Sequence, residues 1–121
     1  MYNTANAYRV YETNNVTTAS PKRLIIMLCD GAIRLCKLSE IAIREKNIEK
    51  KNEYLKRAQA ILGELSFTLN FDAGEIANQL SDLYAFMMRE LVYANIKMDA
   101  EKVKSVRELL EELREAWSEI V

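Results

Sequence analysis

The 121-residue sequence contains no histidine. This absence excludes catalytic triads built on histidine, histidine-ligated zinc, and the Glu-x-x-His pairs of di-iron helix bundles. The sequence also lacks a Gly-rich phosphate-binding loop, a Cys-x-x-Cys pair and a Gly-x-Ser-x-Gly nucleophile turn. We therefore expect no catalytic residue, no cofactor and no metal site.

Cysteine is almost as scarce, with only Cys29 and Cys36, seven positions apart. On one helix their Cα atoms would be separated by about 10.5 Å along the axis. A disulfide requires Cα atoms within about 7 Å. We expect two reduced, buried thiols that pack as small apolar side chains.

Long apolar runs and an excess of one charge are also missing. The longest apolar run is 24–29, six residues, whereas a membrane-spanning helix needs about 20. Residues 1–20 contain no apolar block of the kind found in secretory signals. The net charge of −1 lacks the basic excess of a nucleic-acid-binding domain. These features predict a soluble, intracellular protein without membrane insertion or nucleic-acid binding.

The charges are nevertheless unevenly distributed along the chain. Residues 22–57 include ten basic and five acidic side chains, and residues 58–95 include one basic and five acidic side chains. Two interpretations remain open. The basic and acidic halves attract each other across the fold, or the basic half attracts an acidic partner.

What the sequence does contain is helical periodicity, which recurs four times. Ser20 and Pro21 form a strong helix start, and Asp99 can cap the last helix. Apolar stripes with 3–4 spacing predict helices over about 21–43, 48–69, 75–96 and 100–120. Short connections between helices of similar length force antiparallel neighbours. The prediction is an all-α protein: an up-down-up-down four-helix bundle over 20–121, preceded by an N-terminal arm over 1–19 that is mobile or docked in a groove.

The predicted inward positions are the apolar residues of these four stripes. They are Leu24, Leu28, Gly31, Leu35, Leu38 and Ala42, flanked by Ile25, Cys29, Ala32, Cys36 and Ile43; then Leu55, Ala58, Leu62, Leu65 and Leu69, flanked by Ile61; Ile76, Leu80, Leu83, Met87, Leu91 and Ala94; and Val103, Val106, Leu110, Leu113, Trp117 and Ile120.

Two segments allow a role in binding. Residues 84–88 (Tyr-Ala-Phe-Met-Met) place aromatic and thioether side chains on more than one side of a helix, as in core packing or in an adaptable groove for a partner helix. The arm carries aromatic and β-branched residues in a polar setting, which fits a free tail or a segment that rests on the bundle. The candidate partner-binding residues are Tyr8, Val10, Tyr11, Tyr84, Met87, Met88 and Leu91.

Short local sequences spread along the whole chain resemble one known family. These are Asn6-Ala7-Tyr8, Val16, Thr18-Ala19-Ser20-Pro21, Leu24-Ile25, Met27-Leu28, Asp30-Gly31-Ala32, Ala58-Gln59, Glu64-Leu65, Leu83-Tyr84, Met87, Arg89, Leu91, Ala94-Asn95, Leu110, Leu113-Arg114 and Ala116-Trp117. They resemble the FliS family of flagellin export chaperones.

The resemblance implies a non-enzymatic, cytoplasmic chaperone of the flagellar type III export system. Members of that family bind the disordered C-terminal region of flagellin, prevent its premature polymerisation and deliver it to the export gate. The resemblance also implies that the Asn6-Ala7-Tyr8 element takes part in partner binding.

A second hypothesis is a small all-helical enzyme of the chorismate mutase type, which also works without histidine. Arg34, Arg57, Gln59 and Arg89 could supply the polar groups of such a site. The two hypotheses differ in one observable feature. An enzyme requires a cavity inside the bundle lined by cations, whereas a chaperone requires an apolar surface outside it.

Overall fold

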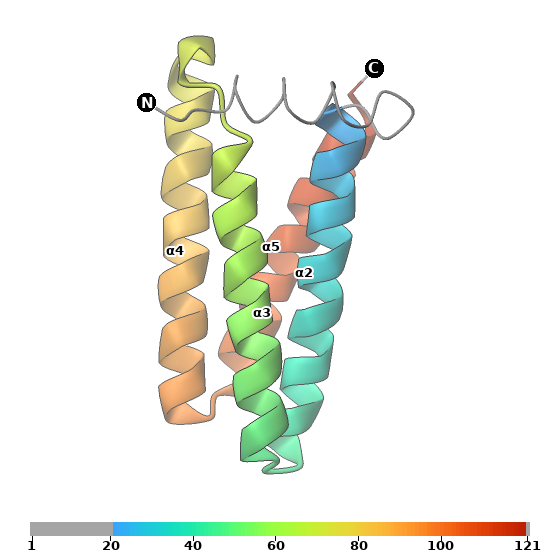
Figure 1. Cartoon of the computed structure of the whole chain (residues 1–121), viewed down its shortest axis with the longest axis vertical. Helices are drawn as coiled ribbons and strands as arrows, with labels where there is room; N and C mark the ends of the chain where they lie inside the picture. The colour runs from blue at the N-terminus through green and yellow to red at the C-terminus, as the bar shows by residue number, and fades with distance from the viewer. Residues whose placement is uncertain (1–20, 121) are drawn as a thin grey trace.

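The computed structural model describes residues 21–120, which form a four-helix bundle with no strand in this range (Figure 1). The helices are α2 (Pro21–Arg44), α3 (Ile48–Phe67), α4 (Glu75–Lys97) and α5 (Ala100–Ser118), with the 3-10 helix η1 (Phe71–Ala73) between α3 and α4.

Each helix packs against the next helix in the chain, and α5 also packs against α2. Successive helices run in opposite directions (Figure 1). The predicted all-α, up-down-up-down bundle is confirmed. The predicted arm lies outside the described residues.

The helices begin and end at polar residues and turns that the sequence provides. The side chain of Asp99 accepts a hydrogen bond from the Lys102 backbone N–H at 3.1 Å, so the predicted cap of the last helix is confirmed. Asn47 caps α3 in the same way through the Lys50 N–H. Gly74 precedes α4 with φ of 86°, a left-handed conformation that glycine adopts without a steric penalty.

The apolar stripes form one continuous core. The predicted inward residues of α3 from Leu55 to Leu65 are buried, as is Leu69 just beyond the helix, while the flanking Ile61 is half-buried. On α2 the flanking stripe, which contains Cys29 and Cys36, forms the centre of the core, while Leu24 and several predicted partners are half-buried.

The predicted burial was wrong at two positions, one at the start of α4 and one just beyond the end of α5. Ile76 is 55% exposed and its neighbour Ala77 is buried instead. The physical reason is that α4 packs more extensively on α3 than on α5, which turns its buried side toward α3. Ile120 is exposed because α5 ends at Ser118.

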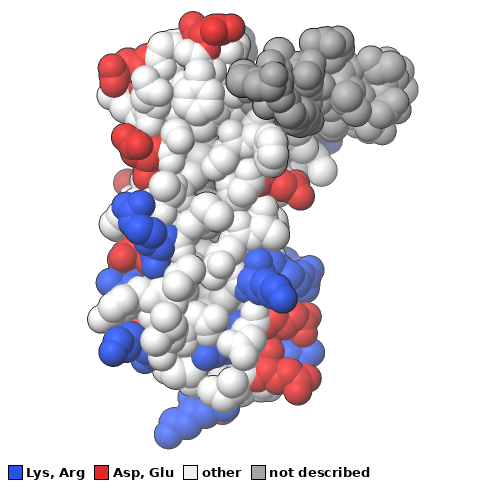
Figure 2. Space-filling view, turned by 60° about the vertical axis from the view of Figure 1, so that its left-hand side comes forward, with Lys and Arg blue, Asp and Glu red and all other residues white. Residues whose placement is uncertain are grey.

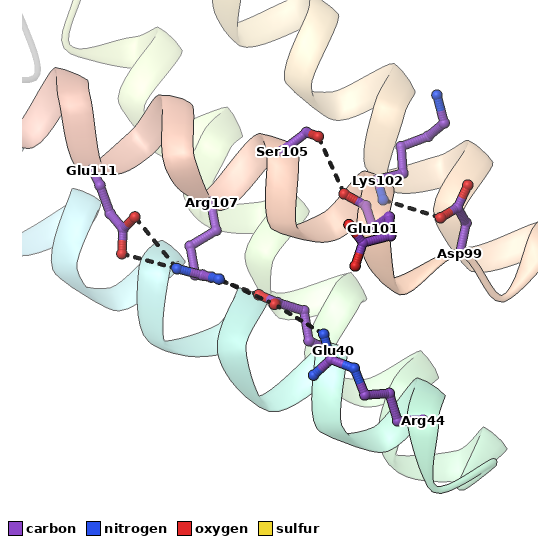
Figure 3. Close-up of polar contacts among 8 residues, drawn as sticks. All are labelled: Glu40, Arg44, Asp99, Glu101, Lys102, Ser105, Arg107 and Glu111. Atoms are coloured by element: carbon purple, nitrogen blue, oxygen red, sulfur yellow. Dashed lines mark hydrogen bonds and ion pairs between the residues drawn. The ribbon is translucent and has the colours of Figure 1, made fainter.

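Two arginines of α5 connect it to α2. Arg107 donates from Nε and Nη2 to the two carboxylate oxygens of Glu40, at 2.7 and 3.2 Å (Figure 3). The Glu40 side chain is only 5% exposed, and hydrogen bonding to it raises the pKa of Arg107 above its usual range. Arg114 makes a similar 2.7 Å contact with Asp30, but both of these side chains are largely exposed.

We predict that Arg107→Ala destabilises the bundle by roughly 3 kcal/mol, the lower end of the cost of breaking a buried ion pair. The carboxylate of Glu40 would remain buried, with only Arg44 nearby at 3.8 Å. Arg114→Ala is the matched control on the same pair of helices, and should change stability little because solvent screens that pair. Urea denaturation would measure both variants. Equal losses would contradict a special role for the buried pair.

Candidate partner-binding surface

The residues predicted to bind a partner on α4 lie mostly in the core. Tyr84, Met87 and Leu91 are almost completely buried, because their 3–4 spacing points them all inward. Met88 is half-buried at the margin of the core. Direct contact with the three buried side chains would require neighbouring helices to separate, so their role in binding stays a prediction. The remaining candidates, Tyr8, Val10 and Tyr11, lie outside the described residues.

The apolar surface of α4 is formed by other residues, which were not among the predicted binding residues. Ile96 is 73% exposed and Val92 is 45% exposed. At the same end of the antiparallel bundle, Ile48 at the start of α3 is half-exposed. The available signal was that these large apolar side chains fall outside the predicted inward stripes or, for Ile48, at a helix end.

One edge of α4 faces α3 and carries no charge. Lys51 of α3 donates from Nζ to the backbone carbonyl of Asn95 at 3.0 Å, which places this side of α4 next to α3. Val92, Met88 and Ala85 precede Asn95 at helical 3–4 spacing and therefore lie on the same side. We call the surface formed by this edge of α4 and the adjoining edge of α3 the α3–α4 face.

The α3 side of this face has an open position at Gly63. Ile61 points toward α2, where its Cδ1 lies 3.2 Å from the place a Cβ of Gly31 would take. Gly63, two positions later, therefore lies on the opposite flank of α3, toward α4. Apart from its own helix backbone and chain neighbours, no atom of residues 21–120 lies within 4 Å of the place a Cβ of Gly63 would take. The exposed Ala60 precedes it by one turn, so another chain can approach the α3 backbone closely here.

Charged groups mark the margins and ends of the α3–α4 face. Figure 2 shows a broad uncharged area on this side, with acidic side chains at the end of the α3–α4 turn and basic side chains toward the opposite end. Asp72 and Glu75 belong to the acidic end, and Lys97 in the last turn of α4 belongs to the basic end. The face thus suits an elongated, amphipathic segment with an apolar side.

The two thiols lie inside the bundle. Cys29 and Cys36 are free and buried. The pKa of Cys29 is raised to about 11, mainly by burial and to a lesser extent by the nearby Asp30 carboxylate. Burial, followed by the Glu40 carboxylate, raises the pKa of Cys36 to about 12. Both thiols therefore stay protonated near neutral pH, which is the opposite of what a nucleophile requires.

The basic residues considered for an enzyme of the chorismate mutase type do not share a cavity. Arg34, Arg57 and Arg89 are exposed on three different helices, and Gln59 is half-buried. The buried cation of the described core, Lys51, is bound to the α4 backbone. Within residues 21–120, no group of acidic and cysteine side chains is placed to hold a metal ion. None of α2 to α5 has the length and hydropathy needed to cross a bilayer.

Comparison with known proteins places this fold among flagellar proteins. Residues 4–121 match the family described as flagellar protein FliS. The chain is 38% identical to the flagellar secretion chaperone FliS of Bacillus subtilis over 96% of this chain and 86% of that protein. It is 36% identical to the flagellar secretion chaperone FliS of Campylobacter jejuni, over 94% of this chain and 90% of that protein.

The fold has a close counterpart among solved structures. A crystal structure of a bacterial flagellar chaperone superposes with a TM-score of 0.77 and covers 94% of each chain at 18% identity. At that identity the likeness concerns the fold alone.

We predict that iodoacetamide modifies neither thiol of the native protein at pH 8, but modifies both in denaturant.

The thiols should also make stability depend on pH. Because the pKa values of both thiols in the folded protein lie above the ordinary value of 9.0, the thiols favour the native state below pH 9. This contribution is lost as the pH rises toward 11 and 12. Stability should therefore fall more steeply above pH 9 in wild type than in a Cys29→Ala/Cys36→Ala variant. If the stability of wild type and of this variant fell in parallel above pH 9, the raised pKa values of the two thiols would be contradicted.

Proposed function

This chain belongs to the FliS family of flagellar proteins, and we propose that it is a cytoplasmic export chaperone for flagellin. In this proposal it binds the disordered C-terminal region of newly made flagellin and prevents premature polymerisation. It then delivers flagellin to the gate of the flagellar type III export apparatus. The curated relatives are themselves named flagellar secretion chaperones, which supports the proposal.

In this proposal the α3–α4 face is the surface that binds flagellin. A flagellin segment that folds into an amphipathic helix would cover Val92, Ile96 and Ile48 with its apolar side, and its backbone would approach α3 at Gly63. Burial of apolar surface contributes about 25 cal/mol per Å². Ordering a disordered segment costs several kcal/mol of that gain, so the complex is firm but can be released.

In this proposal the export gate, rather than the chaperone itself, causes the release of flagellin. The sequence has no phosphate-binding loop through which nucleotide hydrolysis could drive a conformational change. Contacts at the export gate that compete for the same apolar side of flagellin would therefore supply the free energy of transfer.

We predict that Val92→Asp weakens binding of a flagellin C-terminal peptide by at least about tenfold, because the carboxylate would be desolvated in the complex. Ile41→Asp is the matched control. Ile41 is also β-branched and half-exposed, at 49% against 45% for Val92, but it lies on α2. Isothermal titration calorimetry would compare both variants with wild type, after thermal melts show that they fold.

The possible results separate the site from the function. Loss of affinity in both variants, or in neither, would contradict the α3–α4 face as the binding site. Failure of the wild-type protein to bind the peptide would contradict the proposed function itself.

The arm is proposed to protect the apolar surface when no client is bound. Its aromatic residues would gain by burial on the bundle, and incoming flagellin would displace it. We predict that Tyr8→Ala changes the affinity for the flagellin peptide by about 1 kcal/mol or more. Tyr2→Ala, in the same segment, is the control. A chain beginning at Thr18 should still fold but aggregate more readily. If neither Tyr8→Ala nor the shortened chain differed from wild type in affinity or solubility, the arm would not have this role.

A further inference from the structure

A hollow lies between α4 and α5, on the side of α4 opposite the α3–α4 face. Its volume is about 280 Å³. Its floor is apolar and is formed by Phe86 of α4 with Val106 and Leu109 of α5. Its rim is acidic and is formed by Glu90, Glu108 and Glu112. We call it the α4–α5 groove.

The acidic rim is not neutralised within the bundle. Glu90 binds Lys102 at 3.0 Å, and the Lys102 ammonium also lies 4.7 Å from the centre of the Tyr93 ring. Glu108 and Glu112, in contrast, form no ion pair with any residue of the described range 21–120. The groove therefore keeps a net negative charge.

The two arginines of α5 are engaged elsewhere, and Lys104, one turn before Glu108, forms no ion pair with it among residues 21–120. Arg107 binds Glu40 on α2 and also pairs with Glu111 of α5 at 3.2 Å (Figure 3), and Arg114 contacts Asp30, which also lies on α2. The acidic row then continues along α5, where Glu111 and Glu115 join Glu108 and Glu112 around a shallow hollow of about 450 Å³. Like charges four residues apart on a helix repel each other, and a cationic partner would relieve this repulsion.

We propose that the α4–α5 groove binds a basic amphipathic helix of a partner protein. An apolar side chain of that helix would contact Phe86 and Leu109. Lysine or arginine residues one turn apart would pair with Glu108 and Glu112, which are themselves one turn apart, about 6 Å along α5. This surface lies on the flank of α4 opposite the α3–α4 face, so the inference does not depend on the flagellin proposal.

Charge selects this occupant over segments of the same chain. Residues 1–20 contain one basic and one acidic residue, Arg9 and Glu12, and have no cationic cluster to match the rim. A second copy could offer its basic first half, residues 22–57. Such a contact would join copies either reciprocally in a dimer or head to tail, so its signature is self-association of the protein.

The test uses a fluorescein-labelled helical peptide with one leucine stripe flanked by lysines, and a counterpart with glutamates in place of the lysines. Fluorescence anisotropy should show that wild-type protein binds the leucine–lysine peptide and not its counterpart. Glu108→Gln/Glu112→Gln should weaken binding about tenfold, and Phe86→Ala should weaken it by a similar factor. Glu45→Gln/Glu64→Gln, which removes two exposed carboxylates outside the groove, should leave affinity within about twofold.

Several results would overturn the proposal. They are equal losses in the two glutamine variants, unchanged affinity in Phe86→Ala, or binding of both peptides alike. Self-association that disappears in Glu108→Gln/Glu112→Gln would assign the groove to a second copy. Thermal melts must first show that each variant folds. Val92→Asp should still bind the leucine–lysine peptide, which separates this test from the flagellin proposal.

Discussion

The contact between α2 and α5 is the constraint on which the rest of the bundle depends. Each of the other neighbouring pairs is joined by a short connection, but α2 and α5 meet only through packing and side-chain bonds. Glu40, almost fully buried, receives two hydrogen bonds from Arg107 across this contact. Because the partners are far apart in the chain, the contact must offset the entropy of closing a long loop. Once it forms, α3 and α4 are held on the remaining sides.

The position of α4 follows from this arrangement and explains why both proposed surfaces adjoin it. Its contact with α5 is less extensive than its contact with α3. The Lys102–Glu90 pair joins it to α5, and Lys51 joins its last turn to α3. One flank consequently presents an uncharged apolar face, and the other presents an acidic groove. A single helix can therefore contribute to two surfaces of different chemistry.

The sequence predicted the helices well because caps and apolar stripes are local features. Asp99 caps α5 as expected, and the inward stripe of α3 is buried throughout. The exposed position of Ile76 could not be predicted, because it depends on how α4 turns between two neighbours. The close ion pairs could not be predicted from segment charge either. Asp30 and Glu40, which lie in the basic segment 22–57, pair with Arg114 and Arg107 of α5, because close pairing depends on register rather than on total charge.

The two helix-interior glycines illustrate how a fold balances stability against access. At Gly31 a side chain would press on Ile61, so the packing of the bundle itself accounts for the missing side chain. At Gly63 a methyl group would contact no other helix in the described part of the chain, and alanine would favour the helix by roughly 1 kcal/mol. The chain thus forgoes intrinsic helix stability at Gly63 without improving its own packing. A stability-directed redesign would replace this residue first, and would thereby narrow a place where the α3 backbone lies open to another molecule.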